Sequence, residues 1–230
     1  MDEVLTLCYE AEINIQNINY SILRESYDSL IFNEASDNDS AWKKFCDKVK
    51  EFFTKVLDAM KRMFAKILTL FGKMNRAGMA SSVNGKMKDV LVPGYSLEDI
   101  ITWANKSVSD IFKLGEAKYP TFNEYCNANN IQFDKNVTSA YGIEKKILDS
   151  YKMAITFVKQ QKKNAETRYK YDLPKSLDNK SDPGKADLKR MFNIQQEAIR
   201  YIQKRTNAAV KYITTAIKRS YNPLIDYKKL

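Results

Sequence analysis

The sequence predicts an all-α protein of five or six helices, an elongated or loose helical bundle with long amphipathic helices. Apolar residues recur at three- and four-residue steps over long stretches, as they do along one face of a helix. Only seven glycines and five prolines occur in 230 residues, whereas a many-stranded fold needs a turn about every 8–12 residues. The strand candidates are weak ones, at residues 89–92 and 131–133.

Six stretches carry helical patterns. The strongest is the heptad stripe, apolar residues whose spacing alternates between four and three positions: Trp42, Cys46, Val49, Phe53, Val56, Met60, Met63, Ile67, Leu70 and Met74. The expected helices span residues 3–33, 41–74, 96–114, 121–128, 138–171 and 183–221, the last with Asp182 and Pro183 as its cap and first-turn pair. Ser96 with Asp99, and Thr121 with Glu124, have the spacing of capping boxes at helix starts.

Clusters of Gly, Pro and small polar residues predict two linkers between these helices. We therefore divide the chain into an acidic amphipathic N-terminal helix (1–34), a basic heptad helix (35–76), a linker (77–95), a central helical region (96–172), a second linker (173–184) and a basic C-terminal helix (185–230).

Charge is distributed unevenly along the chain. Residues 1–40 contain nine acids and one base, whereas residues 41–230 contain nineteen acids and 37 bases. A basic body of this kind predicts an anionic partner. We also expect the acidic helix at 3–33 to pack antiparallel on the basic helix at 41–74, because both have an apolar face to bury and their charges are opposite.

Several kinds of chemistry find no support in the sequence. There is no histidine, which removes the usual general base near neutral pH and the commonest metal ligand. The three cysteines lie far apart and form no CxxC, so we expect buried free thiols in a reducing compartment. No glycine-rich phosphate loop occurs. We expect no enzyme activity, no cofactor and no metal site, and neither a secretory signal nor a membrane-spanning helix.

The heptad helix admits three interpretations. In the first, its apolar stripe is core, either in a bundle or against a partner helix. In the second, the stripe inserts into an anionic membrane surface. In the third, its lysines neutralise the phosphates of a nucleic acid. The candidate membrane or partner face comprises Trp42, Phe53, Met60, Phe64, Ile67 and Phe71.

The C-terminal helix is also cationic. Its bases are either an ordinary solvated face or a surface that binds the DNA backbone without reading bases. The candidate DNA-binding or anion-binding residues are Lys185, Lys189, Arg190, Arg200, Lys204, Arg205, Lys211, Lys218 and Arg219. Tyrosines interleaved with these bases, Tyr201 among them, are candidates for stacking on single strands, although packing is the simpler expectation.

The junction between the acidic helix and the basic body reads Phe32-Asn33-Glu34-Ala35. It resembles the hydrophobic-x-Glu cleavage site of prohead proteases of large tailed phages, with Phe32, Glu34 and Ala35 as the processing-site residues. Together with the basic Phe/Lys/Trp helix that follows, residues 1–76 are similar to internal head, prohead-core and ejected virion proteins of such phages.

The resemblance implies a leader that targets the protein to the assembling head and is then removed. The function we expect is therefore that of a non-enzymatic virion structural protein of the capsid interior, made in the host cytoplasm. It would associate nonspecifically with packaged DNA or with other virion proteins. The alternatives are a membrane-perturbing protein that acts through residues 41–74, and a host-directed helical interaction protein.

Overall fold

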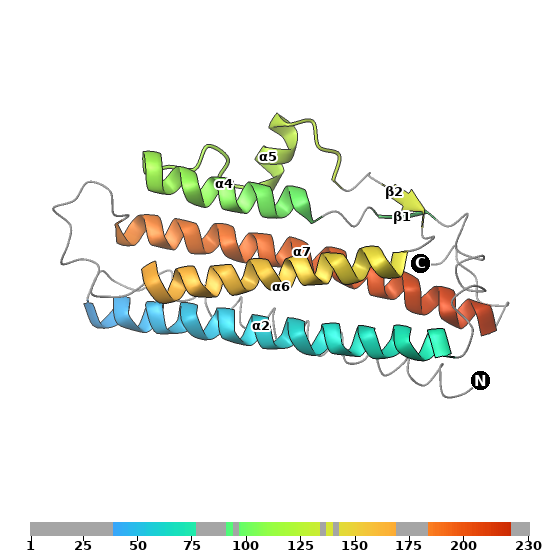
Figure 1. The fold of residues 1–230 in the computed structure, drawn as a ribbon. Coiled ribbons are helices and arrows are strands. Elements are labelled where there is room, and N and C mark those ends of the chain that lie inside the picture. Colours follow the sequence, from blue (N-terminus) through green and yellow to red (C-terminus); the bar gives the residue numbers. More distant parts are fainter. Residues whose placement is uncertain are drawn as a thin grey trace.

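The computed structural model describes residues 39–76, 91–93, 97–133, 137–139, 143–168 and 184–221. Within these residues the chain folds as a helical bundle (Figure 1), and the all-α class expected from the sequence is confirmed. The helices are α2 (Asp39–Arg76), α4 (Glu98–Leu114), α5 (Phe122–Ala128), α6 (Ile143–Arg168) and α7 (Lys185–Tyr221). The helix expected at residues 3–33 lies outside the described residues.

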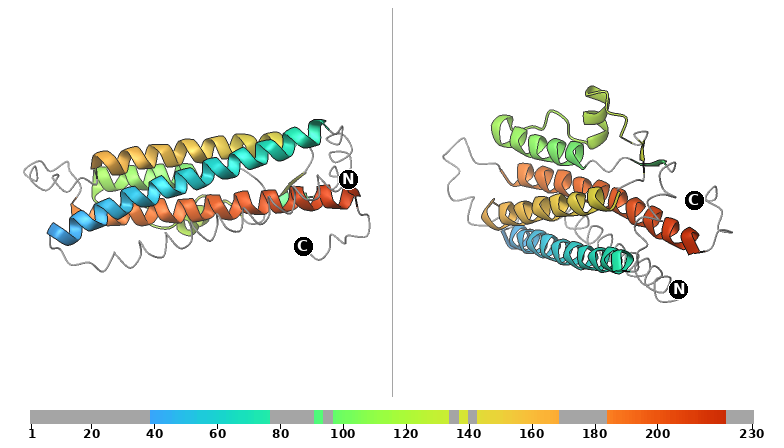
Figure 2. Two further views of the ribbon diagram at one scale, coloured as in Figure 1. Left: turned by 90° about the horizontal axis from the view of Figure 1, so that it is seen from below. Right: turned by 45° about the vertical axis from the view of Figure 1, so that its right-hand side comes forward.

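The central helix of the bundle is α7. In Figure 1 and in the right-hand view of Figure 2, α4 and α5 lie on one side of α7, while α2 and α6 lie on the other. The main packing contacts join α2 to α6 and α4 to α7, and α6 also contacts α7. Because α2, α6 and α7 are long and run alongside one another, this part of the molecule is elongated, as expected.

The heptad stripe is buried along the described length of α2. Its residues from Trp42 to Leu70 are no more than 7% exposed. The ring of Phe192 on α7 meets three α2 rings edge to face, at centroid distances of 5.7, 5.5 and 6.0 Å from Phe45, Phe52 and Phe53. Further along α2, Phe64 lies 6.4 Å from Tyr151 of α6. The described partners of the stripe are therefore α6 and α7. The antiparallel packing that we expected between residues 3–33 and this helix lies outside the described residues.

A second group of aromatic residues joins α4, α5 and α7. Phe122, the first residue of α5, lies 4.9 Å from the ring of Phe133 and 4.8 Å from that of Tyr201 on α7. It also lies 5.4 Å from Trp103 of α4. Since a helix of seven residues is unstable alone, these contacts hold α5 in place.

The capping boxes expected at two helix starts have different outcomes. At α5 the box is confirmed, because the Glu124 amide donates to Thr121 Oγ1 and the Thr121 amide donates to Glu124 Oε2. At α4 the prediction is wrong. The N-cap there is Leu97, which makes no side-chain cap and is instead buried in the core.

A polar layer interrupts the apolar core between α6 and α7. Gln195 Nε2 donates to Gln161 Oε1 at 2.6 Å, and Gln161 Nε2 donates to Asn105 Oδ1 of α4 at 3.4 Å. Both glutamines are at most 2% exposed. Buried amides need partners, so this chain of hydrogen bonds favours one alignment of the three helices over a shifted one.

Two short strands accompany the helices. β1 (Leu91–Pro93) pairs antiparallel with β2 (Val137–Ser139). β1 overlaps the candidate at 89–92, whereas the candidate at 131–133 is wrong, because these residues form no strand and Phe133 is buried there. The helix expected from residue 138 begins at Ile143 instead. β-branched Val137 and Thr138 pair with β1 and thereby displace the helix start.

The two cysteines in the described residues, Cys46 and Cys126, are buried free thiols. Burial raises the pKa of Cys46 to about 12, and the neighbouring Asp47 charge acts in the same direction. Because the thiolate is the reactive form, Cys46 is a poor nucleophile in the folded protein.

We expect Phe192→Ala to lower the free energy of unfolding by about 3–5 kcal/mol, because it removes the ring shared by three α2 phenylalanines. Urea denaturation followed by circular dichroism measures the loss. The control is Leu68→Ala on the outer face of α2, 44% exposed, which should change the value by less than about 0.5 kcal/mol. Equal effects from the two variants would contradict this assignment of the core.

Candidate functional site

The expected membrane or partner face of the heptad helix lies inside the bundle. Five of its six residues are at most 6% exposed: Trp42, Phe53, Met60, Ile67 and Phe71. The sixth, Phe64, is partly buried beside Tyr151. A bilayer can reach this face only if α2 leaves α6 and α7. Among the described contacts, the interpretation of the stripe as bundle core is therefore the one that fits.

The basic residues expected to bind DNA on the C-terminal helix have several different environments. Four are exposed, at Arg190, Arg200, Lys204 and Lys211. Lys185 and Lys189 are partly buried, and Arg205 is buried. The side chains of Lys218 and Arg219 lie outside the described residues. Because α7 is covered on two sides, these bases form only a narrow exposed strip.

Arg205 corrects the expectation that it binds DNA. It is 6% exposed and donates through Nη2 to the carbonyl oxygen of Phe133. Its guanidinium also lies 3.8 Å from the centroid of the Phe133 ring. A guanidinium stacks on aromatic faces and remains charged when buried. Arg205 therefore fixes the segment after α5 onto α7 and does not face solvent.

Among the described residues, the most cationic surface lies on α2 and α6. We call it the lysine layer and define it by the described, at least partly exposed bases of the two helices: Lys43, Lys44, Lys48, Lys50, Lys55, Lys61, Arg62, Lys66, Lys145, Lys146, Lys152, Lys159, Lys162 and Lys163. The acids on the same faces are Asp47, Glu51, Asp58, Asp149 and Glu166. The lysine layer therefore has an excess of nine positive charges over these acids.

Helical spacing aligns the cations of α2 into a row. Lys44 and Arg62 are separated by about five turns, as are Lys48 and Lys66, so all four project from nearly the same side of the helix. The exposed Lys145, with Lys163 five turns further on, has the same relation on α6. Two neighbouring helices thus each present a row of bases to solvent.

Four of the five acids within the lysine layer are already paired with bases: Glu51, Asp58, Asp149 and Glu166. Glu51 lies 2.9 Å from Lys55 and 3.7 Å from Lys48, and the hydrogen bond from Lys55 lowers the pKa of its carboxyl. The acids of α6 lie 3.4 Å from Lys152 and 3.9 Å from Lys162. Exposed pairs of this kind add little stability. The bases that outnumber these acids remain, so the lysine layer presents net positive charge to solvent.

The other side of α7 has the opposite charge. Residues 97–133, which include α4 and α5, contain three lysines and five acids.

Leu68 is the only exposed large apolar side chain among the described residues, and Tyr201 packs against Phe122 and Phe133. The lysine layer therefore has no exposed aromatic platform among its described residues for stacking on bases.

The connection between α4 and α5 is fixed at both ends by α7. Arg190 Nη1 donates to the carbonyl oxygen of Gly115 at 3.2 Å, and the amide of Phe122 donates to Glu197 Oε1 at 3.1 Å. Gly115 caps α4 with a φ of 74°, a conformation that favours glycine. In the middle, the carbonyl oxygen of Tyr119 accepts hydrogen bonds from Trp103 Nε1 at 2.9 Å and Ser107 Oγ at 3.0 Å.

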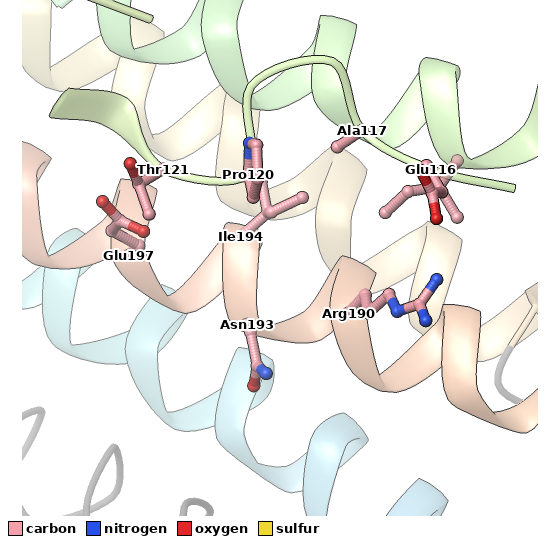
Figure 3. A pocket seen from close by; sticks show the side chains of 9 residues that line it. Glu116, Ala117, Pro120, Thr121, Arg190, Asn193, Ile194 and Glu197 are labelled. Carbon is pink, nitrogen blue, oxygen red and sulfur yellow. The ribbon is translucent and has the colours of Figure 1, made fainter. Parts of the chain in front are cut away.

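A groove of about 490 Å³ lies between this connection and α7. Figure 3 shows Arg190 near Glu116 at one end and Glu197 near Thr121 at the other. Its apolar lining is Ile111, Ala117, Pro120 and Ile194. Burial raises the pKa of Glu197, although its hydrogen bond from Phe122 and the charge of Arg200 oppose this shift. Sequence reasoning missed the groove, because its walls come from segments about 75 residues apart.

The remaining expectations find little further evidence. The processing site at Phe32, Glu34 and Ala35 lies outside the described residues. In the part of the chain that the structure describes, no group of three or more Cys, Asp or Glu side chains is placed to hold a metal ion. None of the described helices is long and apolar enough to cross a membrane. No family model matches the chain, and no curated protein or solved structure is detectably similar to it.

We expect Arg205→Met to lower the free energy of unfolding by about 1–3 kcal/mol, because it leaves the carbonyl oxygen of Phe133 without this donor. Its neighbour Lys204 is exposed, so Lys204→Met is the matched control and should change stability by less than about 0.5 kcal/mol. Denaturant unfolding and a DNA-binding assay are run on both. Unchanged stability together with a large loss of DNA binding for Arg205→Met would contradict its structural role.

Proposed function

We propose that this protein is a non-enzymatic structural protein of a phage virion, internal to the head or delivered with the DNA, and that it binds DNA nonspecifically through the lysine layer. The observation that carries the DNA-binding part is the excess of nine positive charges on the outward faces of α2 and α6. Duplex DNA carries about one negative charge per 1.7 Å of helix axis, so rows of bases meet phosphates in many alignments. The assignment to a phage head rests on the resemblance of residues 1–76.

The composition of the lysine layer supports backbone binding without base readout. All of its bases except Arg62 are lysines. Lysine acts as a point charge on phosphates, whereas arginine supplies the planar fork that recognises guanine edges. Binding through lysines neutralises phosphates and releases counterions, so it should weaken steeply as salt rises.

The membrane alternative has weaker support. Anionic lipid would also attract the lysine layer, but the apolar face needed for insertion is packed against α6 and α7. Binding to neutral liposomes, or binding to anionic liposomes that persists at high salt, would favour a membrane protein over a DNA-binding one. Binding to neither DNA nor liposomes would favour a host-directed interaction protein.

We expect the affinity of the wild-type protein for duplex DNA to fall steeply as salt rises. The affinity of the triple variant Lys44→Gln, Arg62→Gln and Lys66→Gln should depend less steeply on salt. The slope of log K against log salt falls by about 0.9 for each phosphate that the protein no longer neutralises, so the triple variant should reduce it by up to about 2.7. Fluorescence anisotropy with a labelled duplex of arbitrary sequence, across a salt series, measures the slope.

The matched control is Lys106→Gln, Lys113→Gln and Lys118→Gln, which removes the same charge from the α4 side of the molecule. Circular dichroism establishes that both triple variants remain folded. If the two triple variants reduce the slope equally, then net charge and not the lysine layer determines binding, and the proposed surface is wrong.

The phage assignment makes a separate prediction. Co-expression with a prohead protease should yield a product that begins at Ala35, and Glu34→Gln should block the cut. Cleavage there would remove seven acids and one base, which raises the net charge of the product from +10 to +16 and should increase its affinity for DNA. Intact mass spectrometry identifies the product. A chain that stays uncut under conditions that process a known substrate would contradict the assignment.

A further inference from the structure

The groove between the α4–α5 connection and α7 is held in a fixed shape by side-chain hydrogen bonds. Arg190 and Glu197 fix its two ends, and Trp103 and Ser107 fix the carbonyl oxygen of Tyr119 between them. The amide of Lys118 also donates to Asp110 Oδ2 at 3.3 Å. A site whose walls are already ordered loses little entropy when a ligand binds.

The two ends of the groove have opposite charge. Arg190 has a side chain that is 56% exposed, and its Nη1 already donates to Asp187 Oδ1 at 3.2 Å. Glu197 is partly buried, and one of its oxygens accepts from the amide of Phe122. The second oxygen accepts no hydrogen bond within the described residues, and the charge of Arg200 offsets only part of the effect of burial on this carboxyl. This end therefore suits a cation, while the guanidinium at the other end suits a carboxylate.

The distance between the ends sets the length of the occupant. Arg190 and Glu197 are two turns apart on α7, which corresponds to about 10 Å along the helix axis. A peptide extended in the polyproline II conformation rises about 3.1 Å per residue with three residues per turn, so side chains three residues apart lie on one face at about that distance. Between the two charges, Ile194, Ala117 and Pro120 offer an apolar lining for a small side chain. The groove volume of about 490 Å³ lies in the range of small-ligand sites.

We propose that this groove binds an extended segment of a partner protein that carries one acidic and one basic side chain about three residues apart. The basic side chain pairs with Glu197 and the acidic one with Arg190. The groove lies on the side of α7 opposite the lysine layer, so the proposal does not depend on DNA binding.

The test uses the full chain, labelled with ¹⁵N, and three blocked tetrapeptides. Two have an acidic and a basic end in either order, acetyl-Glu-Leu-Ala-Lys-amide and acetyl-Lys-Ala-Leu-Glu-amide, and the third is acetyl-Gln-Leu-Ala-Gln-amide. We expect at least one of the charged peptides to shift the amide signals of Ala117, Thr121 and Ile194. It should bind at least about tenfold more tightly than the neutral peptide, because the neutral peptide cannot form the two charge-assisted hydrogen bonds.

A double-mutant cycle separates direct pairing from a structural role of Glu197. Glu197→Gln keeps an oxygen to accept from the amide of Phe122 but removes the charge. It should weaken binding of the charged peptide about tenfold, yet leave unchanged the affinity for a peptide whose Lys is replaced by Gln. The exposed Glu166→Gln on α6 is the control, and it should have no effect.

Three results would overturn the proposal. The first is the absence of shifts in the groove at millimolar peptide, and the second is equal binding of charged and neutral peptides. The third is that Glu197→Gln weakens binding of the Lys-containing peptide and of the peptide with Gln in its place by the same factor. Glu197 would then act only by holding α5.

Discussion

The bundle depends on α7 packing two of its faces at once. Through Phe192 it meets the phenylalanines of α2, and through Gln195 it meets α6. On another side of its surface, Tyr201 and Arg205 meet Phe122 and Phe133 of the α5 region. Neither α2 with α6 nor α4 with α5 has a described aromatic contact with the other pair. The two pairs are therefore joined mainly through α7, with the hydrogen bond from Gln161 of α6 to Asn105 of α4 as a direct link between them.

This packing also determines where charge is available. On α7, Arg205 is buried against Phe133, while Arg190 and Glu197 hold the α4–α5 connection. The helix that looked most suited to bind DNA thus uses several of its charges internally. On α2 and α6, in contrast, uncharged residues supply the packing, and the bases remain on the outer faces. The surplus positive charge is found on the helices whose inner faces need no charge to pack.

The sequence predicted the helices better than their partners. The heptad stripe follows from local spacing, which is why its burial from Trp42 to Leu70 was predicted correctly. Local spacing cannot tell which helix covers a stripe, and it treats a buried glutamine such as Gln195 as a surface residue. Arg205 was misassigned for the same reason, because its position inside the bundle depends on Phe133, 72 residues away. The groove is harder still, since both hydrogen bonds that hold its ends span 75 residues.

The two proposed surfaces differ in how they would recognise a partner. The lysine layer has many similar charges, no exposed aromatic rings among its described residues and no fixed register, so it suits a repeating polyanion bound in many alignments. The groove has one anionic and one cationic group at a fixed separation, with its backbone held by five hydrogen bonds, so it suits a defined segment. Because α7 stands between them, a ligand on one surface does not cover the other. A molecule bound to DNA through α2 and α6 would therefore still present the groove, and could link the DNA to a protein that carries the matching segment.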